Sequence, residues 1–300
     1  MTKPRAILGI FLLGVVFLAS CSKVTPPKTR PLTEAHQKFV KICKEEYKLD
    51  VVIAALEHTV WIYVPLPEGL LQVAATPDGV RKSETFEERP AVKHLEASYD
   101  NRRFLITHDI QPEKTYDQSQ GYKMDYTSAY RLASQAVLTT VSRAYFQADD
   151  APQFFVVVIS DFKKGVEIEN IFYLEDFKRY MTMESIPQEE FVKRNIYEVK
   201  GHRDWIGDSA GRHLAYTEIT MPEFLAKQIA ARINFKYQKS AFPPSADTRG
   251  EILKIVAETF KNYNFTDFNY IEVRDRNTGL TETVLPTEIN RISGDPASRD

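Results

Sequence analysis

A long amphipathic helix followed by an uninterrupted apolar strand is the strongest structural pattern in this 300-residue sequence. In the segment 126–146, apolar and small residues recur at helical spacing. The residues of that face are Leu132, Ala133, Ala136, Val137, Thr140, Val141, Ala144 and Tyr145. The segment 153–160 contains Phe-Phe-Val-Val-Val-Ile, and such a continuous apolar run is typical of a strand buried on both faces. We therefore expect a central strand at 153–160, backed by the helix.

Hairpin patterns occur four times in the rest of the chain. Strand-like segments rich in β-branched and aromatic residues flank short polar turns. These hairpins are expected at 51–66, 92–110, 153–173 and 268–285. Two further strands, 196–199 and 214–219, are expected to flank a polar loop. The pattern predicts an α+β fold, in which antiparallel hairpins form a sheet with helices packed on one side.

Additional helices are predicted from apolar spacing and from start signals. Apolar residues at spacings of three and four run from Leu32 to Tyr47, and shorter helices are expected at 174–182 and 188–194. Capping boxes at 220–223 and 248–251 indicate where two more helices begin.

The order of helix followed by hairpin recurs along the chain. Three amphipathic helices end near Tyr47, Tyr145 and Tyr263, and a hairpin follows each of them. A repeated helix-hairpin unit, giving two or three subunits, is one interpretation. The other is that an α+β domain contains this order by chance, because the residues themselves align poorly.

Composition excludes several classes of protein. Hydrophobic residues make up 43% of the chain and charged residues 27%, which is typical of a globular domain. The formal net charge of −2 gives no electrostatic basis for binding nucleic acid. The sequence contains no phosphate loop, dinucleotide fingerprint, CxxC motif or metal-binding cluster, so we predict no cofactor and no metal.

The first 21 residues have the pattern of an export signal. Lys3 and Arg5 form a short basic start, residues 7–17 are apolar apart from two glycines, and small residues precede Cys21. A basic region, an apolar region of this length and a small-residue cleavage site define a secretory signal. The apolar run is too short for a comfortable membrane span, which needs roughly 20 residues.

The four residues Leu18-Ala19-Ser20-Cys21 resemble the lipobox of bacterial lipoproteins. The resemblance implies cleavage before Cys21 and acylation of that cysteine, which anchors the chain to the lipid bilayer of the cell envelope. In a Gram-negative host, Ser22 in place of aspartate implies the periplasmic face of the outer membrane. Residues 22–31 contain three prolines, and we expect residues 21–31 to form an extended tether.

Only one other cysteine is present in the chain. Cys43 shares a predicted helical face with Phe39 and Tyr47. If Cys21 carries lipid, Cys43 has no partner for a disulfide within the chain. A reactive thiol is one interpretation, and a buried small hydrophobic residue is the favoured one.

The polar loop 201–213 is the best candidate for a functional site. Its chemistry-bearing residues are His202, Asp204, Trp205, Asp208, Ser209 and His213. Three roles are open: a structured surface loop, a weak ligand-binding site, or a hydrolase site with Ser209 as nucleophile and His213 as base. The context of a nucleophile elbow is absent, and the spacing of the two histidines is not that of a zinc site, so a surface loop is favoured.

These observations divide the chain into four regions: signal peptide 1–20, tether 21–31, globular region 32–286 and polar tail 287–300. The favoured function is a non-enzymatic binding or assembly module on the membrane surface, with an envelope protein as its partner. The alternative is a lipid-anchored hydrolase that uses the loop 201–213. An enzyme would need a pocket where its catalytic groups converge, whereas a binding module would present an apolar patch or groove.

Overall fold

The computed structural model describes residues 29–73, 87–115, 124–182, 184–238 and 247–292. The predicted signal peptide, Cys21 and the tether up to residue 28 lie outside the described residues. Within these ranges the chain forms seven α-helices and eleven strands in three sheets, which confirms the predicted α+β class. None of the described helices is both long enough and apolar enough to cross a membrane.

The helices are α1 (Glu34–Glu45), α2 (Ser128–Tyr145), α3 (Leu174–Met181), α4 (Gln188–Arg194), α5 (Met221–Gln238), α6 (Thr248–Tyr263) and α7 (Pro286–Ile292). The strands are β1 (Val52–Ala55), β2 (Thr59–Leu66), β3 (Leu71–Val73), β4 (Glu87–Asp100), β5 (Arg103–Thr115), β6 (Met124–Tyr126), β7 (Phe154–Asp161), β8 (Val166–Tyr173), β9 (Ile196–Gly201), β10 (Tyr270–Asp275) and β11 (Thr281–Val284).

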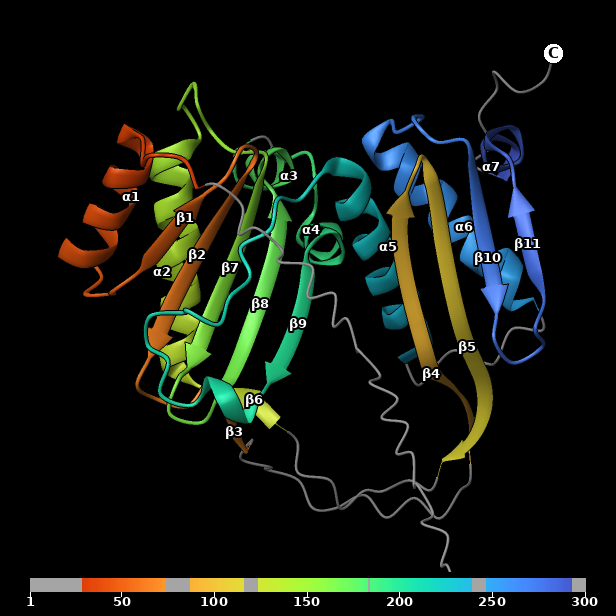
Figure 1. Cartoon of the computed structure of the whole chain (residues 1–300), viewed down its shortest axis with the longest axis horizontal. Helices are drawn as coiled ribbons and strands as arrows, with labels where there is room; N and C mark the ends of the chain where they lie inside the picture. The colour runs from red at the N-terminus through yellow and green to blue at the C-terminus, as the bar shows by residue number, and fades with distance from the viewer. Residues whose placement is uncertain (1–28, 74–86, 116–123, 183, 239–246, 293–300) are drawn as a thin grey trace, which may run out of the picture.

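The two large sheets share one arrangement of strands (Figure 1). The first sheet has the order β1-β2-β7-β8-β9, and the second has the order β11-β10-β5-β4. In each, two antiparallel hairpins meet through a parallel pair, β2 with β7 and β5 with β10. A helix, α2 or α6, precedes the second hairpin in each case, because parallel neighbours need a crossover connection. Strands β3 and β6 form a separate small sheet.

Strand β7 occupies the centre of the first sheet, and all eight of its residues are buried. One face of this sheet packs against α1, α2 and α3. On α2, the buried face includes Val137, Val141 and Tyr145, as predicted. Leu132, however, is 67% exposed, although it was predicted to be part of that face. Tyr130 instead contributes to the buried face near the start of the helix.

The opposite face of the first sheet is covered by an irregular segment and by α5. The segment 202–220, here called the strap, crosses this face (Figure 1). Its part 214–219 was predicted to be a strand, but it pairs with no described strand. Side chains of the sheet bind its backbone instead: Trp61 Nε1 donates to the carbonyl of Thr217 at 2.8 Å. The residues 214–219 therefore form an extended segment that crosses the face of the sheet, and they are not a strand within a sheet.

Other predicted boundaries shift by a residue or two. Glu223 accepts hydrogen bonds from the backbone and side chain of Thr220, as the first capping box predicts. At α6 the cap is Asp247, whose carboxylate accepts from the backbone of Gly250. The region predicted as a tail begins inside α7, whose Ile289 is 2% exposed.

Helix α5 lies between the two halves of the molecule. Its Phe224 contacts Phe154 and Tyr173 of the first sheet, with ring centroids 5.1 and 6.4 Å apart. Ile229 and Ile233 are fully buried in the same core cluster as Phe104 and Ile271 of the second sheet. One hydrophobic core therefore continues from the first sheet through α5 to the second sheet.

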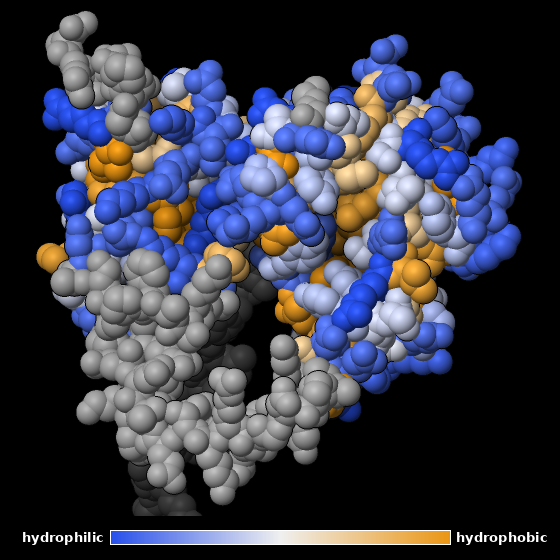
Figure 2. All heavy atoms as spheres, turned by 180° about the vertical axis from the view of Figure 1, so that it is seen from behind, coloured by the Kyte–Doolittle hydropathy of each residue, from blue (hydrophilic) through white to orange (hydrophobic). Residues whose placement is uncertain are grey.

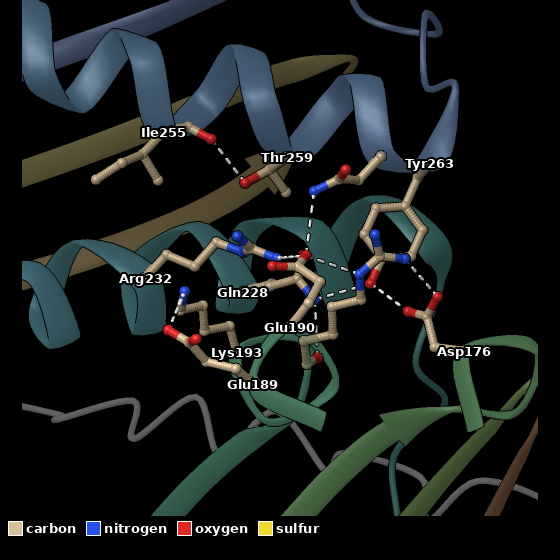
Figure 3. A network of polar contacts seen from close by, with 11 residues as sticks. Asp176, Glu189, Glu190, Lys193, Gln228, Arg232, Ile255, Thr259 and Tyr263 are labelled. Carbon is tan, nitrogen blue, oxygen red and sulfur yellow. Dashed lines mark hydrogen bonds and ion pairs between the residues drawn. The ribbon is translucent and has the colours of Figure 1, made fainter. Parts of the chain in front are cut away.

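A buried polar network reinforces the same junction (Figure 3). Arg194 of α4 donates to Asp176 of α3 at 2.7 Å and to Glu190 at 2.9 Å. Arg232 of α5 also donates to Glu190, at 2.8 Å. Tyr263, at the end of α6, donates its hydroxyl to Asp176. The network thus connects helices from both halves through alternating charges.

Candidate functional site

The strap places His213 between two carboxylates. Its Nδ1 lies 2.8 Å from Asp208 Oδ2, and its Nε2 lies 2.7 Å from Glu167 Oε1. Glu167 comes from β8, where it lies on the face of the sheet that the strap covers. The side chains of His213 and Glu167 are only 12% and 2% exposed. Two residues of the predicted site, Asp208 and His213, are therefore brought together with a carboxylate from a distant strand.

Aromatic rings enclose the imidazole of His213. Trp205 stacks on it with ring centroids 5.0 Å apart and an interplanar angle of 21°. The ring of Tyr63 packs against it in a T-shaped arrangement, with ring centroids 6.0 Å apart. The Tyr63 hydroxyl donates to the carbonyl of Asp208 at 2.7 Å. This packing shields the two hydrogen bonds from water and fixes the orientation of the ring.

The two carboxylates respond differently to this environment. Burial raises the pKa of Glu167, although the nearby His213 acts in the opposite direction. Partial burial also disfavours the charge of Asp208, but hydrogen bonds from the ring and backbone of His213 and from the backbone of Ala210 hold its pKa below the ordinary value. Asp208 therefore remains a stable acceptor, and Glu167 depends for its compensation chiefly on His213, with a smaller contribution from a hydrogen bond with Ser160.

Trp205 thus also joins this cluster, whereas the remaining predicted site residues, His202, Asp204 and Ser209, do not. Ser209 is exposed, and its hydroxyl has no hydrogen-bond partner among the described residues. His202 and Asp204 form an exposed local pair, with 3.5 Å between Nδ1 and Oδ2. Because both ring nitrogens of His213 are engaged by carboxylates, neither is available to accept a proton from Ser209. The arrangement fits a structural clasp that holds the strap to the sheet.

A second set of hydrogen bonds holds the C-terminal end of the strap. Glu218 accepts hydrogen bonds from the backbone of Glu57 and His58 at 2.8 and 2.7 Å, and from the hydroxyl of Thr59 at 2.9 Å. These donors belong to the β1–β2 turn and the first residue of β2. A carboxylate with three donors is a strong local anchor. The strap is thus fixed at both ends of its path across the sheet.

Replacing His213 by alanine is expected to lower the free energy of unfolding by about 2–3 kcal/mol near neutral pH, because Glu167 is left buried without its partner. The sign of the pH dependence follows from the raised pKa of Glu167. Its burial carries no charge cost below the unfolded pKa, ordinarily 4.5, and a growing cost above it. Urea unfolding at several pH values should therefore show the deficit of His213→Ala shrinking as the pH falls.

The exposed His202→Ala provides the matched control for this measurement, with an expected change within about 0.5 kcal/mol. An equal deficit for His213→Ala at acidic and neutral pH would contradict the role given to Glu167.

An aromatic groove lies on the other side of the first sheet. It has a volume of about 780 Å³ and runs between α2, α3, α4 and the edge strand β9. Its aromatic lining consists of Tyr126, Tyr130, Phe177, Tyr180, Phe191 and Tyr197. Two of the pairs are stacked, Tyr126 with Tyr130 at 4.7 Å and Tyr180 with Phe191 at 4.5 Å.

Apolar side chains continue from this groove onto the surrounding surface. Met181 and Val192 line the groove and are 49% and 51% exposed, and Val199 on the adjacent strand is 59% exposed. Seen from behind, hydrophobic residues reach the surface in several places among hydrophilic ones (Figure 2). Apolar grooves with exposed apolar margins are typical of surfaces that bind a protein or a ligand.

Comparison with models of protein families, with curated proteins and with solved structures finds no match for this chain. In the described ranges, no group of three or more His, Cys, Asp or Glu side chains is arranged to hold a metal ion.

Glu167 and the aromatic residues of the groove were not predicted as site residues, and their sequence signal is weak. Glu167 and Glu169 alternate with apolar residues in a strand that follows a turn, so a strand face carrying both side chains needs a basic or hydrogen-bonding partner if it is buried. The groove drew residues from five elements that are far apart in the sequence, and its tyrosines and phenylalanines also fit ordinary core positions. Neither the His213 cluster nor the groove can be recognised until the arrangement of the strands and helices is known.

Proposed function

We propose that this chain is a lipid-anchored protein of the bacterial cell envelope whose folded region is a non-enzymatic binding module. The Leu18-Ala19-Ser20-Cys21 motif supports the anchor, with acylated Cys21 in the bilayer. Two or more acyl chains give stable attachment, whereas one gives only marginal binding. In a Gram-negative host, Ser22 favours the periplasmic face of the outer membrane.

The aromatic groove is the observation that carries the proposal of a binding module. Exposed apolar residues at its margin gain free energy when a partner covers them, about 25 cal/mol for each Å² buried. Tyrosine and phenylalanine contribute large contact areas at little cost in side-chain entropy. The proposed partner is an envelope protein with an apolar segment that fills the groove.

The geometry of the strap gives no support to the alternative hydrolase. A serine hydrolase needs a base within hydrogen-bond distance of its nucleophile. His213 is held by Glu167 and Asp208, and Ser209 points to no such base among the described residues. A structural clasp accounts for the same residues.

The test is capture of partners from envelopes by cross-linking, purification and mass spectrometry. The variant Met181→Glu/Val192→Glu places two charges on exposed positions of the groove, so that it disrupts binding without burying a charge. We expect the lipidated wild-type chain to enrich a defined set of envelope proteins, and this variant to lose most of that set.

A matched control carries the same change in the other half of the molecule. Leu280 and Leu285 are 70% and 51% exposed, and Leu280→Glu/Leu285→Glu adds the same two charges there. This control should retain the partners of the wild type. Identical sets of proteins for all three chains would contradict a binding role of the groove.

A further inference from the structure

The exposed face of α1 carries a row of lysines. Lys41, Lys44 and Lys48 lie three and four residues apart, and Lys38 lies one turn earlier. All four are exposed, and the ammonium groups of Lys38, Lys41 and Lys44 form no ion pair with any described residue. Lys48 follows the helix, and its Nζ donates to the carbonyl of Glu45 at 2.7 Å, a contact that leaves its charge uncompensated.

The carboxylates on α1 compensate this charge only in part. Glu46 is bound by Arg143 through hydrogen bonds of 2.6 and 2.8 Å, so its charge is already paired. Glu34 lies in the first turn, where the helix dipole favours an acidic side chain, and Glu45 is exposed beside the lysines. On α1 itself the lysines therefore exceed the carboxylates in charge, while Asp149 and Asp150 line a hollow beside Lys38 at its N-terminal half.

Charge is divided unequally between this end of the chain and the rest. Residues 21–48 contain seven basic and three acidic side chains, whereas residues 49–300 contain 30 basic and 38 acidic side chains. An anionic surface would therefore attract the N-terminal end and repel the remainder on average. Such an asymmetry gives a preferred orientation as well as attraction.

The position of α1 in the chain adds a geometric argument. Glu34 is the first residue of the helix and lies 13 residues after Cys21, a separation that spans at most about 45 Å when fully extended. The helix is thus the first described element after the proposed anchor. It also lies at the outer edge of the first half, away from the second sheet (Figure 1).

We propose that the lysine face of α1 docks on anionic phospholipid headgroups of the bilayer to which Cys21 is anchored. This inference rests on the proposed lipid anchor and adds the surface that faces the membrane. Basic side chains near an anionic bilayer each contribute attraction that salt screens. Docking through α1 directs the second sheet away from the bilayer.

The experiment uses the mature chain, residues 21–300, with Cys21→Ser so that no lipid is attached. Its co-sedimentation is measured with vesicles of phosphatidylcholine alone and with vesicles that contain phosphatidylglycerol. We expect binding only to the anionic vesicles, with release as the salt concentration rises. Lys41→Glu/Lys44→Glu should weaken this binding at least about tenfold.

The matched control is Lys163→Glu/Lys227→Glu, which changes the net charge equally at two exposed lysines outside α1. It should retain most of the binding. Equal losses in the two variants, equal binding to both kinds of vesicle, or no binding to either would overturn the proposal. None of these results affects the anchor itself, which acylation of the full chain tests separately.

Discussion

Replacing Val156 by aspartate is expected to unfold the protein or to lower its free energy of unfolding by roughly 4 kcal/mol or more. Val156 is fully buried in the central strand β7. Its neighbours in the two adjacent strands are Trp61 and Ile171, which offer a carboxylate no free donor. A charge at this position is therefore both desolvated and unpaired. Thermal melting followed by circular dichroism measures the effect.

The matched control for this substitution is Val199→Asp in the edge strand β9. Val199 is 59% exposed, so an aspartate there remains in water. We expect a change within about 0.5 kcal/mol. Similar melting temperatures for Val156→Asp and the wild type would contradict the central position of β7.

The second large effect is expected from Arg194→Ala, which should cost about 3–5 kcal/mol. The Arg194 side chain is 9% exposed, and its partner Asp176 is 2% exposed. The guanidinium also lies over the ring of Tyr263, 5.4 Å from its centroid. Its removal leaves the charge of Asp176 buried, and among the described residues only the Tyr263 hydroxyl then donates to it. Chemical denaturation gives the change in the free energy of unfolding.

Two comparisons separate this effect from the general loss of an arginine. Arg131 forms an exposed pair with Asp125, and Arg131→Ala should cost no more than about 1 kcal/mol. The double variant Asp176→Leu/Arg194→Met removes both buried charges, so it should be more stable than Arg194→Ala. If Arg194→Ala and Arg131→Ala cost the same, the buried network does not hold the two halves together.

The same network predicts a dependence on pH. Burial disfavours the charge of Glu190, but hydrogen bonds from Arg232 and Arg194 outweigh that effect and lower its pKa below the ordinary 4.5. A carboxyl with a lowered pKa contributes stability above its unfolded pKa and loses it as the pH falls through the folded value. Acid should therefore weaken the junction between the halves.

The sequence pattern predicted six of the seven described helices, the four hairpins and the central strand, because each depends on residues close in sequence; α7 was wrongly predicted to be part of a polar tail. The run 154–159 and the buried face of α2 are examples. The parallel pairs β2–β7 and β5–β10 join segments that lie about 90 or more residues apart in the sequence. Hydrophobic periodicity describes only residues close in sequence, so it does not predict such pairs. The two-sheet architecture therefore emerged only from the structure.

The candidate site shows the same limit. The loop 201–213 was identified from its concentration of polar and aromatic residues, and three of the predicted site residues, Trp205, Asp208 and His213, do lie together. Their role depends on Glu167, which β8 supplies from more than 40 residues away. Cys43 was correctly predicted to be buried, and burial raises the pKa of its thiol to about 11. That prediction rested on the helical spacing from Phe39, which is also buried, and on the frequent burial of free cysteines; Tyr47, predicted to share the face, is 37% exposed.

Metabolic labelling with a fatty-acid analogue, followed by fractionation of membranes, tests the proposed lipid anchor most directly. The full chain should be labelled and should sediment with the membranes, and Cys43→Ala should behave in the same way. Cys21→Ala should carry no label, because the lipid is attached through the sulfur of Cys21. Label retained on Cys21→Ala, or a wild-type chain that is unlabelled and soluble, would contradict the account.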